Sequence, residues 1–333
     1  KGVTIMYSEK EMNQMLRVKL FTHTDLDGAG CSVVARRAFM TKKFGFLDVT
    51  YCDYNQINQK IEEFINQGGH IQFDAIFITD ISVNEEVAQK LNDVAGHKLK
   101  LIDHHETAVW LNEKYSWATV IPSEYNEKEK RYQLTSGTSL FYEILVKNNL
   151  LKPDIRLAEF CEIVRQYDSY EWKDVYNNVY PKLMNDLYYL IGRYEFIKRF
   201  SSNPNPLFTR EEKLLLEIEQ KRIDYYIKEK EKSMIKKTME VDGKIYNVGM
   251  VFSDRYQSEL GNYLCENHPD LDFSMMIDLG RNRVSLRGVR DDLDLGQISK
   301  QINNGGGHKK AAGFVLPKDF PFKVLAMLEN LPE

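Results

Sequence analysis

Acidic and imidazole side chains follow three apolar, strand-like segments of this chain, each at the point where the segment ends. They are His23, Asp25 and Asp27 after the first segment, Asp80 after the second, and Asp103, His104 and His105 after the third. In an open parallel sheet such ends lie on one edge, where these folds place their sites. Carboxylates that converge without basic neighbours repel one another, and mixed His and Asp sets bind the divalent cations that relieve this repulsion. The pattern therefore predicts a metal centre, and with it a two-metal hydrolase.

Each residue of this set also has a structural interpretation when it is taken alone. An Asp at a strand end often caps the following helix, which applies to Asp25, Asp27 and Asp80. Three ligand-type residues within five positions, starting at His23, favour the metal over the cap. Two adjacent histidines with an adjacent Asp are rare in a core strand, and Asp103 is suited to orient an imidazole ring by accepting its hydrogen bond.

One more acidic ligand is expected from the helical region that follows residue 151. Asp168 and Asp174 compete for this role, and the sequence does not decide between them. Taken alone, Asp168 is typical of the C-terminal end of a helix or of a turn.

Glycines and basic residues form a second group near the C-terminus. Three successive glycines, Gly305, Gly306 and Gly307, precede His308. If a helix starts here, their backbone N–H groups are suited to bind an anionic oxygen, whereas a plain turn would leave the segment without this role. Arg287, expected on a strand, points either to the same place or into solvent.

The elements that must position the first group are those of an α/β domain. Strand-like and helix-like segments alternate from about 18 to 146, which predicts a doubly wound, mostly parallel sheet. Its strands are nearly continuous apolar runs, as expected for a parallel sheet that is covered on both faces. Helices are expected over 30–39, 55–66, 84–93 and 139–147, the last with its N-cap in 135–138.

Helical patterns continue beyond this region. The stretch from about 151 to 200 is typical of helices throughout, and 209–237 indicates one long, charge-rich helix. Thr209 and Glu212 at its start match a capping box. We interpret this helix as the connector between two domains.

The C-terminal part indicates a second, smaller α+β domain. The expected elements are a hairpin over 239–251 that turns at Asp242-Gly243, helices over 254–267 and 295–303, and strands over 273–279 and 283–289. We therefore predict a sheet domain over 16–200, a helical linker over 201–237 and the smaller domain over 238–333, with a cleft between the two domains.

Composition and charge limit the class of partner. The chain has 333 residues, of which 43% are hydrophobic, and a net charge of −4. This length is sufficient for two domains. A protein that grips a long polyanion usually has a basic excess, so a long nucleic-acid strand is a poor candidate substrate. A short phosphorylated molecule, held by a few local charges, is compatible with this composition.

Other sequence features indicate a cytoplasmic protein. No apolar run of about 18 residues predicts a membrane span, and residues 1–17 are mixed and polar, unlike a secretory signal. The four cysteines are widely spaced and lack a Cys-x-x-Cys motif, so we expect buried free thiols in a reducing compartment. They are Cys31, Cys52, Cys161 and Cys265.

The order and spacing of these motifs resemble those of the DHH phosphoesterases that carry a DHH-associated C-terminal domain. The matching segments are 23–28, 79–80, 103–105, 305–308 and 311–313. The resemblance covers nearly the whole chain from about 18 to 333. The compact layout without added modules most resembles the nano-RNase and oligoribonuclease branch, which is related to RecJ.

This resemblance implies two divalent metal ions, most often Mn²⁺, with Mg²⁺ or Co²⁺ as other candidates. By analogy, His23, Asp25 and Asp80 would hold one ion. The second ion would be held by Asp27, Asp80, His104 and Asp168, so that Asp80 bridges the pair. The surroundings of Asp168 match the family less strictly.

The resemblance also implies a catalytic set and a substrate-binding set. The catalytic set would be Asp80, Asp103, His104 and His105, with His105 near the substrate phosphate. A terminal phosphate or nucleotide would be held by His105, Arg287, Gly305, Gly306, Gly307 and His308.

Our leading interpretation is a metal-dependent phosphodiesterase that hydrolyses short oligonucleotides (nanoRNA) to mononucleotides. The first alternative is a phosphatase on 3′-phosphoadenosine 5′-phosphate or a hydrolase of linear or cyclic dinucleotides, which the same site would serve. The second is a RecJ-like single-strand exonuclease, for which the chain lacks the usual length and basic charge. An inorganic pyrophosphatase is disfavoured by the 305–308 motif.

A non-catalytic nucleotide-sensing module is the alternative from another class, but every expected metal-ligand position is filled. The sequence does not decide the polarity of cleavage, the preference for RNA or DNA, the cellular substrate, or whether the chain forms a homodimer.

Overall fold

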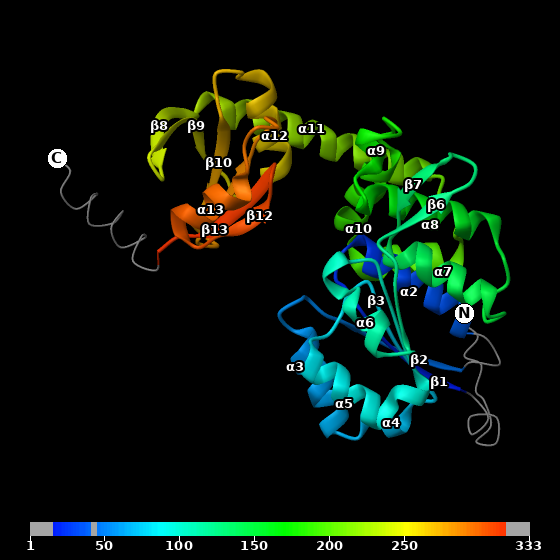
Figure 1. The fold of residues 1–333 in the computed structure, drawn as a ribbon. Coiled ribbons are helices and arrows are strands. Elements are labelled where there is room, and N and C mark those ends of the chain that lie inside the picture. The colour runs from blue at the N-terminus through cyan, green and yellow to red at the C-terminus, as the bar shows by residue number, and fades with distance from the viewer. Residues whose placement is uncertain (1–15, 41–44, 318–333) are drawn as a thin grey trace. The chain divides into compact units, whose positions relative to one another are not determined.

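The computed structural model describes residues 16–40 and 45–317 (Figure 1). The chain divides into two compact units, and the boundary falls between Leu216 and Glu217, inside one long helix. The domain limits expected from the sequence stay a prediction, and the segment 318–333 of the expected C-terminal domain lies outside the described residues.

A parallel five-stranded sheet forms the centre of the first unit. Its strands are β1 (Arg17–Thr22), β2 (Phe46–Tyr51), β3 (Ala75–Thr79), β4 (Leu99–Asp103) and β5 (Ala118–Val120). They are hydrogen-bonded in the order β2-β1-β3-β4-β5, and each neighbouring pair is parallel. Since β2 lies on one side of β1 and β3 on the other, the strand order reverses at β1. The carboxyl ends of β1 and β3 are therefore the switch point at which such sheets bind ligands.

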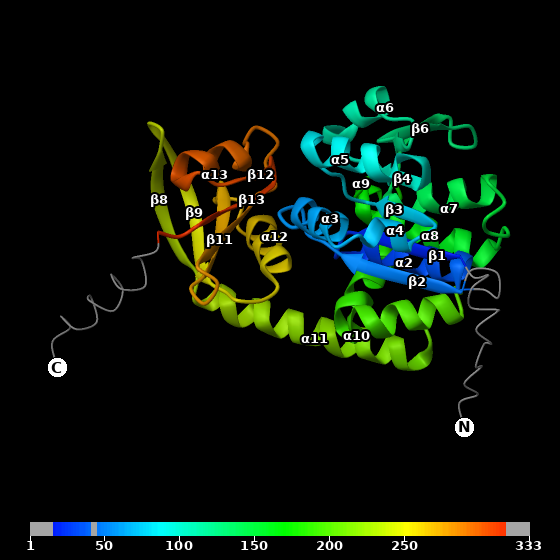
Figure 2. The same ribbon diagram turned by 90° about the horizontal axis from the view of Figure 1, so that it is seen from below.

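Helices cover both faces of this sheet (Figures 1 and 2). One face carries α3 (Ile57–Asn66), α5 (Glu85–Ala95) and α6 (Trp110–Lys114), with α4 (Gly69–Gln72) after α3; the other carries α2 (Leu26–Phe39), α7 (Gly137–Lys147), α8 (Ile155–Asp168) and α10 (Tyr180–Ser202). Successive residues of β1 enter different apolar clusters, Leu20 with α2 and α7 and Phe21 with α3 and α5, because strand side chains alternate between faces. The predicted doubly wound α/β class is confirmed.

Short elements complete this unit. They are η1 (Gly96–Lys98), η2 (Glu106–Ala108), the hairpin β6 (Ser123–Asn126) with β7 (Arg131–Leu134), and α9 (Glu171–Asp174). The helices expected over 55–66, 84–93 and 139–147 are confirmed as α3, α5 and α7, and the region 151–200 is helical as predicted.

The helix α2 begins earlier than the expected residue 30. Its N-cap is Asp25, whose carboxylate accepts the backbone N–H of Gly28. The capping interpretation of Asp25 is thus correct, and it places Asp27 inside the first turn of the helix. For α7 the N-cap is Ser136, which forms a capping box with Ser139, so the expectation of a cap in 135–138 is confirmed.

The second unit contains a mixed six-stranded sheet. Its strands are β8 (Ile235–Val241), β9 (Lys244–Phe252), β10 (Phe273–Asp278), β11 (Arg283–Arg287), β12 (Gly306–His308) and β13 (Ala311–Val315). The spatial order is β12-β13-β11-β10-β9-β8; β9 and β10 are parallel, and the other pairs are antiparallel. Helix α12 (Gln257–Asn267) packs with Met276 of β10, and α13 (Leu295–Asn303) packs with the neighbouring Met275. The two helices therefore cover opposite faces of the sheet.

The connecting helix and the first hairpin show where sequence patterns succeed and fail. In α11 (Arg210–Lys232) the Glu212 carboxylate accepts the Thr209 N–H at 2.7 Å and the Glu212 N–H donates to Thr209 Oγ1 at 3.2 Å, which confirms the capping box. The prediction that this helix reaches 237 is wrong, because 235–241 pairs with β9. The hairpin turn at Asp242-Gly243 is confirmed, with φ of 51° and 74° as a type I′ turn requires.

All four cysteines are buried free thiols, as the sequence predicts. Among the described residues, no helix is both long enough and apolar enough to cross a bilayer.

Candidate metal centre

Three groups of ligand-type side chains meet at the carboxyl edge of the first sheet. In each group the ligand atoms lie within 4.8 Å of one another. The groups are His23 with Asp25 and Asp80; Asp27 with His104 and Asp168; and Asp80 with Asp103, His104 and His105. The structure thus brings together every residue predicted to bind metal. Of the two competing acids, Asp168 belongs to such a group, whereas none of the groups found in the described chain includes Asp174.

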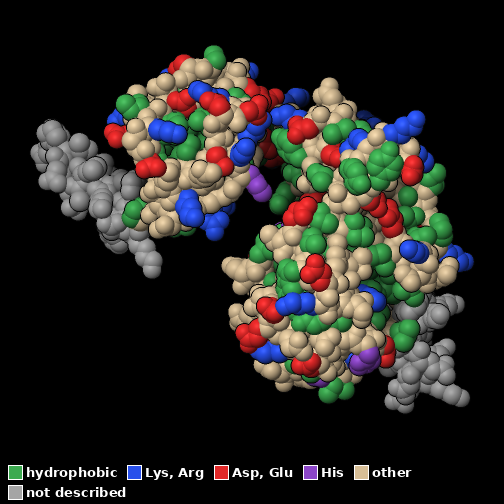
Figure 3. Space-filling view, in the orientation of Figure 1, with side chains coloured by type: hydrophobic (Ala, Val, Ile, Leu, Met, Phe, Trp, Pro, Cys, Tyr) green, Lys and Arg blue, Asp and Glu red, His purple; other side chains and the backbone are tan. Residues whose placement is uncertain are grey.

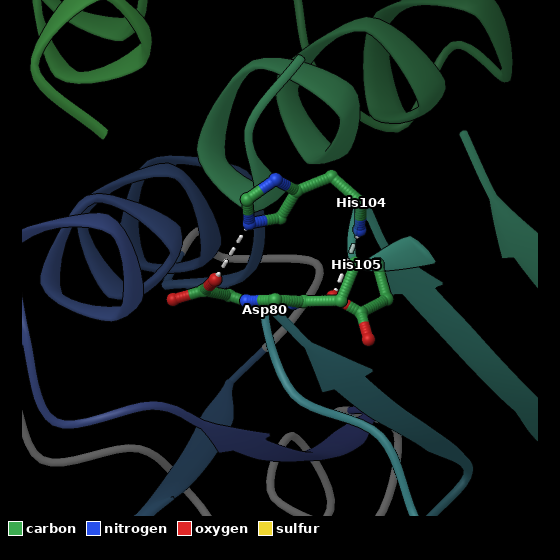
Figure 4. A group of neighbouring side chains, drawn as sticks. Asp80, His104 and His105 are labelled. Atoms are coloured by element: carbon green, nitrogen blue, oxygen red, sulfur yellow. Dashed lines mark hydrogen bonds and ion pairs between the residues drawn. The ribbon is translucent and has the colours of Figure 1, made fainter. Parts of the chain in front are cut away.

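Asp80 lies at the centre of this arrangement. Its Oδ1 is 3.3 Å from Nε2 of His104 (Figure 4), and its Oδ2 is 4.0 Å from Nδ1 of His23. The residue is 1% exposed, and within the described chain its Oδ2 has no hydrogen-bond partner. A buried carboxylate oxygen without a partner is costly. A divalent cation held by His23, Asp25 and Asp80 would satisfy this oxygen, so the donor set fits a metal.

Asp27 is held by the beginning of α7. Its carboxylate accepts the backbone N–H groups of Gly137 at 2.6 Å and Thr138 at 2.9 Å. A Cβ on Gly137 would lie 2.5 Å from the Cβ of Asp80 and 3.0 Å from Asp27 Oδ2, so only glycine fits there. Asp168, the last residue of α8, belongs to the same group as Asp27, and its Oδ2 lies 3.5 Å from His104 Nε2.

A second chain of contacts orients the paired histidines. Asp103 Oδ1 accepts Nδ1–H of His105 at 2.7 Å and the backbone N–H of His104 at 2.8 Å. The Nε2 of His105 then lies 2.9 Å from the hydroxyl oxygen of Tyr54, in the loop after β2. Asp103 thus makes the hydrogen bond to an imidazole that the sequence suggested. Tyr54 was missed, because only the folded position of its loop brings it to His105.

The crowding of carboxylates shifts the pKa values of the buried acids. Burial, and next the charges of Asp27 and Asp25, raise the pKa of Asp80 well above its usual value. Burial and the same two charges also raise the pKa of Asp168. A bound cation reverses this effect because it favours the ionised carboxylates.

The three histidines differ in their titration. Burial lowers the pKa of His104, which favours the neutral imidazole that binds metals. Burial also opposes the charged form of His23 and His105, but the neighbouring carboxylates of Asp25 and Asp103 outweigh it and raise both pKa values.

The second predicted group lies on the sheet of the second unit. Ala311 of β13 is the register partner of Arg287 on one side and of His308 on the other. Directly opposed residues point to the same face, so Arg287 and His308 share one face of the sheet, two strands apart. The Arg287 guanidinium donates to Ser258 Oγ at 2.8 Å and to a backbone carbonyl oxygen.

The expected helix start after the glycines is wrong. The segment 306–308 forms β12, and α13, which confirms the helix expected over 295–303, ends before the glycines. A Cβ on Gly305 would lie 2.1 Å from Ser299 Oγ, and one on Gly307, at φ 139°, would lie 2.5 Å from the Ala311 carbonyl oxygen. These glycines therefore allow an edge strand to pack closely against α13 and β13.

Comparison with known proteins agrees with this geometry. No family model matches the chain. Oligoribonuclease NrnB of Bacillus subtilis (strain 168) is 38% identical over 301 residues, which cover 88% of this chain and 71% of that protein. The chain belongs to the DHH phosphoesterase family.

Other relatives of this DHH phosphoesterase are more distant. A 3′,5′-cyclic-nucleotide phosphodiesterase of Helicobacter pylori is 23% identical, over 90% of this chain and 92% of that protein. Among solved structures, exonuclease RecJ bound to manganese is similar with a TM-score of 0.49 and 12% identity, over 97% of this chain and 93% of that one.

Proposed function

We propose that this chain is a metal-dependent phosphodiesterase that hydrolyses short oligonucleotides to mononucleotides. The observation that carries this proposal is the position of the Asp80 carboxylate, with one oxygen toward His104 and the other toward His23. One carboxylate that belongs to two ligand groups is suited to bridge a pair of cations. The 38% identity to a protein named oligoribonuclease supports the substrate class.

The proposed cofactor is a pair of divalent ions, Mn²⁺ first, with Mg²⁺ or Co²⁺ as other candidates. His23, Asp25 and Asp80 would hold one ion; Asp27, Asp80, His104 and Asp168 would hold the other. When bound, such a pair stabilises charge on the phosphoryl oxygens and lowers the pKa of water.

The chain's own residues would orient the substrate phosphate. Asp103 keeps the proton of His105 on Nδ1 in the neutral ring, which leaves Nε2 facing the Tyr54 hydroxyl. When His105 is protonated, Nε2–H would donate to a phosphoryl oxygen, and the Tyr54 hydroxyl would be a second donor at the same place.

We further propose that the second unit binds the far end of the substrate. Arg287 and His308 share one sheet face, and charged hydrogen bonds of this kind suit a terminal phosphate. The segment Gly305–Gly307 would contribute through its closeness to this face rather than as a helix start.

The distribution of charge favours a short substrate. On the face seen in Figure 3, the described Lys and Arg side chains are interspersed with Asp and Glu and form no continuous basic stripe. The net charge of −4 points the same way, because tracking a long polyanion requires a basic surface.

A second candidate substrate is suggested by the relative named as a 3′,5′-cyclic-nucleotide phosphodiesterase. The same metal centre would serve a cyclic phosphodiester, a linear or cyclic dinucleotide, or 3′-phosphoadenosine 5′-phosphate. These compounds therefore belong in the same assay as competitors of the oligonucleotide.

The test is hydrolysis of a 5′-phosphorylated diribonucleotide with Mn²⁺, comparing Asp80→Ala with Asp25→Ala. Asp80 faces both imidazoles, whereas Asp25 faces His23 and caps a helix. We expect wild-type turnover that EDTA abolishes, no detectable turnover and no tightly bound ion in Asp80→Ala, and residual metal in Asp25→Ala. If the folded wild type with Mn²⁺ does not hydrolyse the dinucleotide, the proposed function is wrong. If Asp80→Ala keeps two tightly bound ions and near-normal turnover, the bridging role is wrong.

A further inference from the structure

A cavity of about 540 Å³ lies in the first unit. It is lined by the C-terminal half of α2, the end of β2 and the second half of α10. None of the residues that line it is acidic, and none belongs to the ligand groups of the metal centre. Its polar and aromatic lining consists of Arg36, Tyr51, Arg193, Tyr194, Lys198, Ser201 and Ser202.

Two arginines of this lining have no carboxylate partner within the described chain. Arg36 makes only a 3.4 Å contact to Met40 Sδ, and its Nε is buried with no hydrogen-bond partner there. The Ser201 hydroxyl is likewise buried and unsatisfied. The Nε of Arg37, one position along α2, is also buried without a partner, but the Arg37 guanidinium is paired with Asp154 at 2.8 Å, whereas that of Arg36 is not paired with a carboxylate. The guanidinium charges of Arg36 and Arg193 are thus not balanced by a carboxylate within the described chain, and an anionic ligand would balance them.

The backbone of α10 is kinked directly before the second arginine, Arg193. Gly192 has φ 77° and ψ 156° inside the helix, and a Cβ there would meet nothing within 4 Å, so the glycine is needed for its conformation. Directly after it, the Arg193 guanidinium lies 3.9 Å from the centre of the Tyr51 ring. The Tyr51 hydroxyl donates to Ser32 Oγ at 2.8 Å, which fixes the ring. A guanidinium stacked in this way keeps its N–H edge for a ligand, and this edge matches phosphate geometry.

The size and the remaining lining indicate more than a bare anion. A volume of about 540 Å³ falls in the range of small-molecule sites and exceeds the needs of phosphate alone. Met40, Ile197 and the exposed ring of Tyr194 add apolar and aromatic surface on which a planar base can lie.

We propose that this cavity is a second ligand site that binds a nucleoside monophosphate. The phosphate accepts hydrogen bonds from Arg36, Arg193 and Ser201, and the base lies against Tyr194. The proposal does not rest on the proposed function, because it requires neither metal nor hydrolysis.

The test is binding of AMP to the full chain, measured by calorimetry in EDTA so that no cation is present. Wild type should bind AMP, and Arg36→Gln or Arg193→Gln should each weaken binding by roughly tenfold or more, the loss expected for a charged hydrogen bond. Arg17→Gln is the matched control, since Arg17 also stacks on an aromatic ring, 5.0 Å from the centre of Phe46, but lies outside the cavity.

Two further variants distinguish AMP binding in this cavity from binding at the metal centre and from binding of phosphate alone. Asp80→Asn should bind AMP as wild type does, and Tyr194→Ala should weaken AMP but not inorganic phosphate. Thermal unfolding of each variant checks that it is folded. The proposal fails if wild type does not bind AMP, if folded Arg36→Gln and Arg193→Gln bind it normally, or if Asp80→Asn abolishes binding. If inorganic phosphate binds as tightly as AMP, the nucleoside part of the proposal is wrong.

Discussion

At the scale of single residues, the candidate metal centre gathers buried carboxylates whose negative charge the protein's own groups do not neutralise. Asp27 and Asp80 are each 1% exposed, and Asp168 faces the same imidazole of His104. Backbone N–H groups satisfy Asp27, but one oxygen of Asp80 has no partner within the described chain. Such a set is stable only when protons or cations neutralise it.

The stability of the metal-free protein should therefore fall as the pH rises. Burial, followed by the charges of Asp27 and Asp25, raises the pKa of Asp80 well above its usual 3.8. Between these two pKa values the folded chain keeps a proton that the unfolded chain releases, so an increase in pH favours unfolding. In EDTA, the thermal unfolding midpoint should be lower at about pH 8 than at about pH 5.

The neutral variant Asp80→Asn is the control for this effect. It cannot release the proton, so its midpoint should change less between the two pH values. Saturating Mn²⁺ should raise the wild-type midpoint more at the higher pH, because the metal binds the ionised carboxylates. If the unfolding midpoint of Asp80→Asn changed with pH as much as that of wild type, Asp80 would not be the cause of the pH dependence.

Sequence alone predicted which ligand-type residues converge at this sheet edge, because their types cluster at strand ends. His23, Asp25 and Asp27 could be recognised from spacing, and Asp103 from its adjacent histidines. Tyr54 could not, since it stands in a loop without a motif and reaches His105 only in the folded chain. Asp168 could be separated from Asp174 only by the position at which α8 ends.

At the scale of elements, a buried ion-pair network connects the hairpin β6–β7 to the end of α8. Arg165 donates to Glu171 Oε2 and to the Leu134 carbonyl oxygen, both at 2.7 Å. Glu171 also accepts from Arg131 at 2.8 Å. Because Asp168 is the last residue of α8 and lies between Arg165 and Glu171 in the chain, this network positions Asp168.

We expect Glu171→Gln to destabilise the fold and to weaken metal binding together. The substitution leaves the buried guanidinium of Arg165 with a weaker partner, at a cost of about 1.5–3 kcal/mol, and it loosens the end of α8 that carries Asp168. Glu129→Gln is the control, because Glu129 pairs with Arg131 nearer the surface and should cost less than about 1 kcal/mol. Denaturant unfolding measures the loss of stability, and Mn²⁺ titration measures the loss of metal affinity. If Glu171→Gln and Glu129→Gln lost the same stability and the same affinity, the positioning role of Glu171 would be contradicted.

The bend in α10 allows a second test at this scale. Gly192→Ala forces a side chain into φ 77° and ψ 156°, a region reserved for glycine, and should cost about 1–3 kcal/mol. Gly68→Ala is matched to it, since neither Cβ would meet an atom within 4 Å. Gly68 has φ 70° and ψ 16°, the left-handed helical region that other residues also reach. Unfolding should therefore show a smaller loss for Gly68→Ala, and the reverse order would refute this account of the bend.

The boundaries of helices and strands could be predicted where capping or turn residues mark them. The prediction failed where only tertiary packing determines which element forms. The capping box at Thr209 and the turn at Asp242-Gly243 were both correct. The glycines at 305–307 left a helix start and a plain turn open, yet the same residues also suit an edge strand that must approach its neighbours closely. The contact of Gly305 with Ser299 and Gly313, which no local pattern reveals, decides between them.

At the scale of the whole molecule, the proposed functional residues divide between two units. The candidate metal ligands lie in the first unit, and Arg287 and His308 lie in the second. Sequence patterns indicated two domains but could not locate the division inside α11. The reason is that helical periodicity continues through it, while Leu216 joins an apolar cluster of the first unit and Ile223 one of the second.

The central claim is that this DHH phosphoesterase acts on short oligonucleotides, and a substrate length series tests it most directly. The series uses 5′- and 3′-labelled oligoribonucleotides from two to about twenty-four nucleotides, with Mn²⁺ and at several salt concentrations. We expect kcat/KM to be highest for the dinucleotide or the next few lengths and to fall steeply beyond them. Salt dependence should be shallow for the dinucleotide, because few phosphates are neutralised. A strand of about twenty nucleotides that is processed as well as the dinucleotide, or better, would contradict the claim and favour a RecJ-like exonuclease.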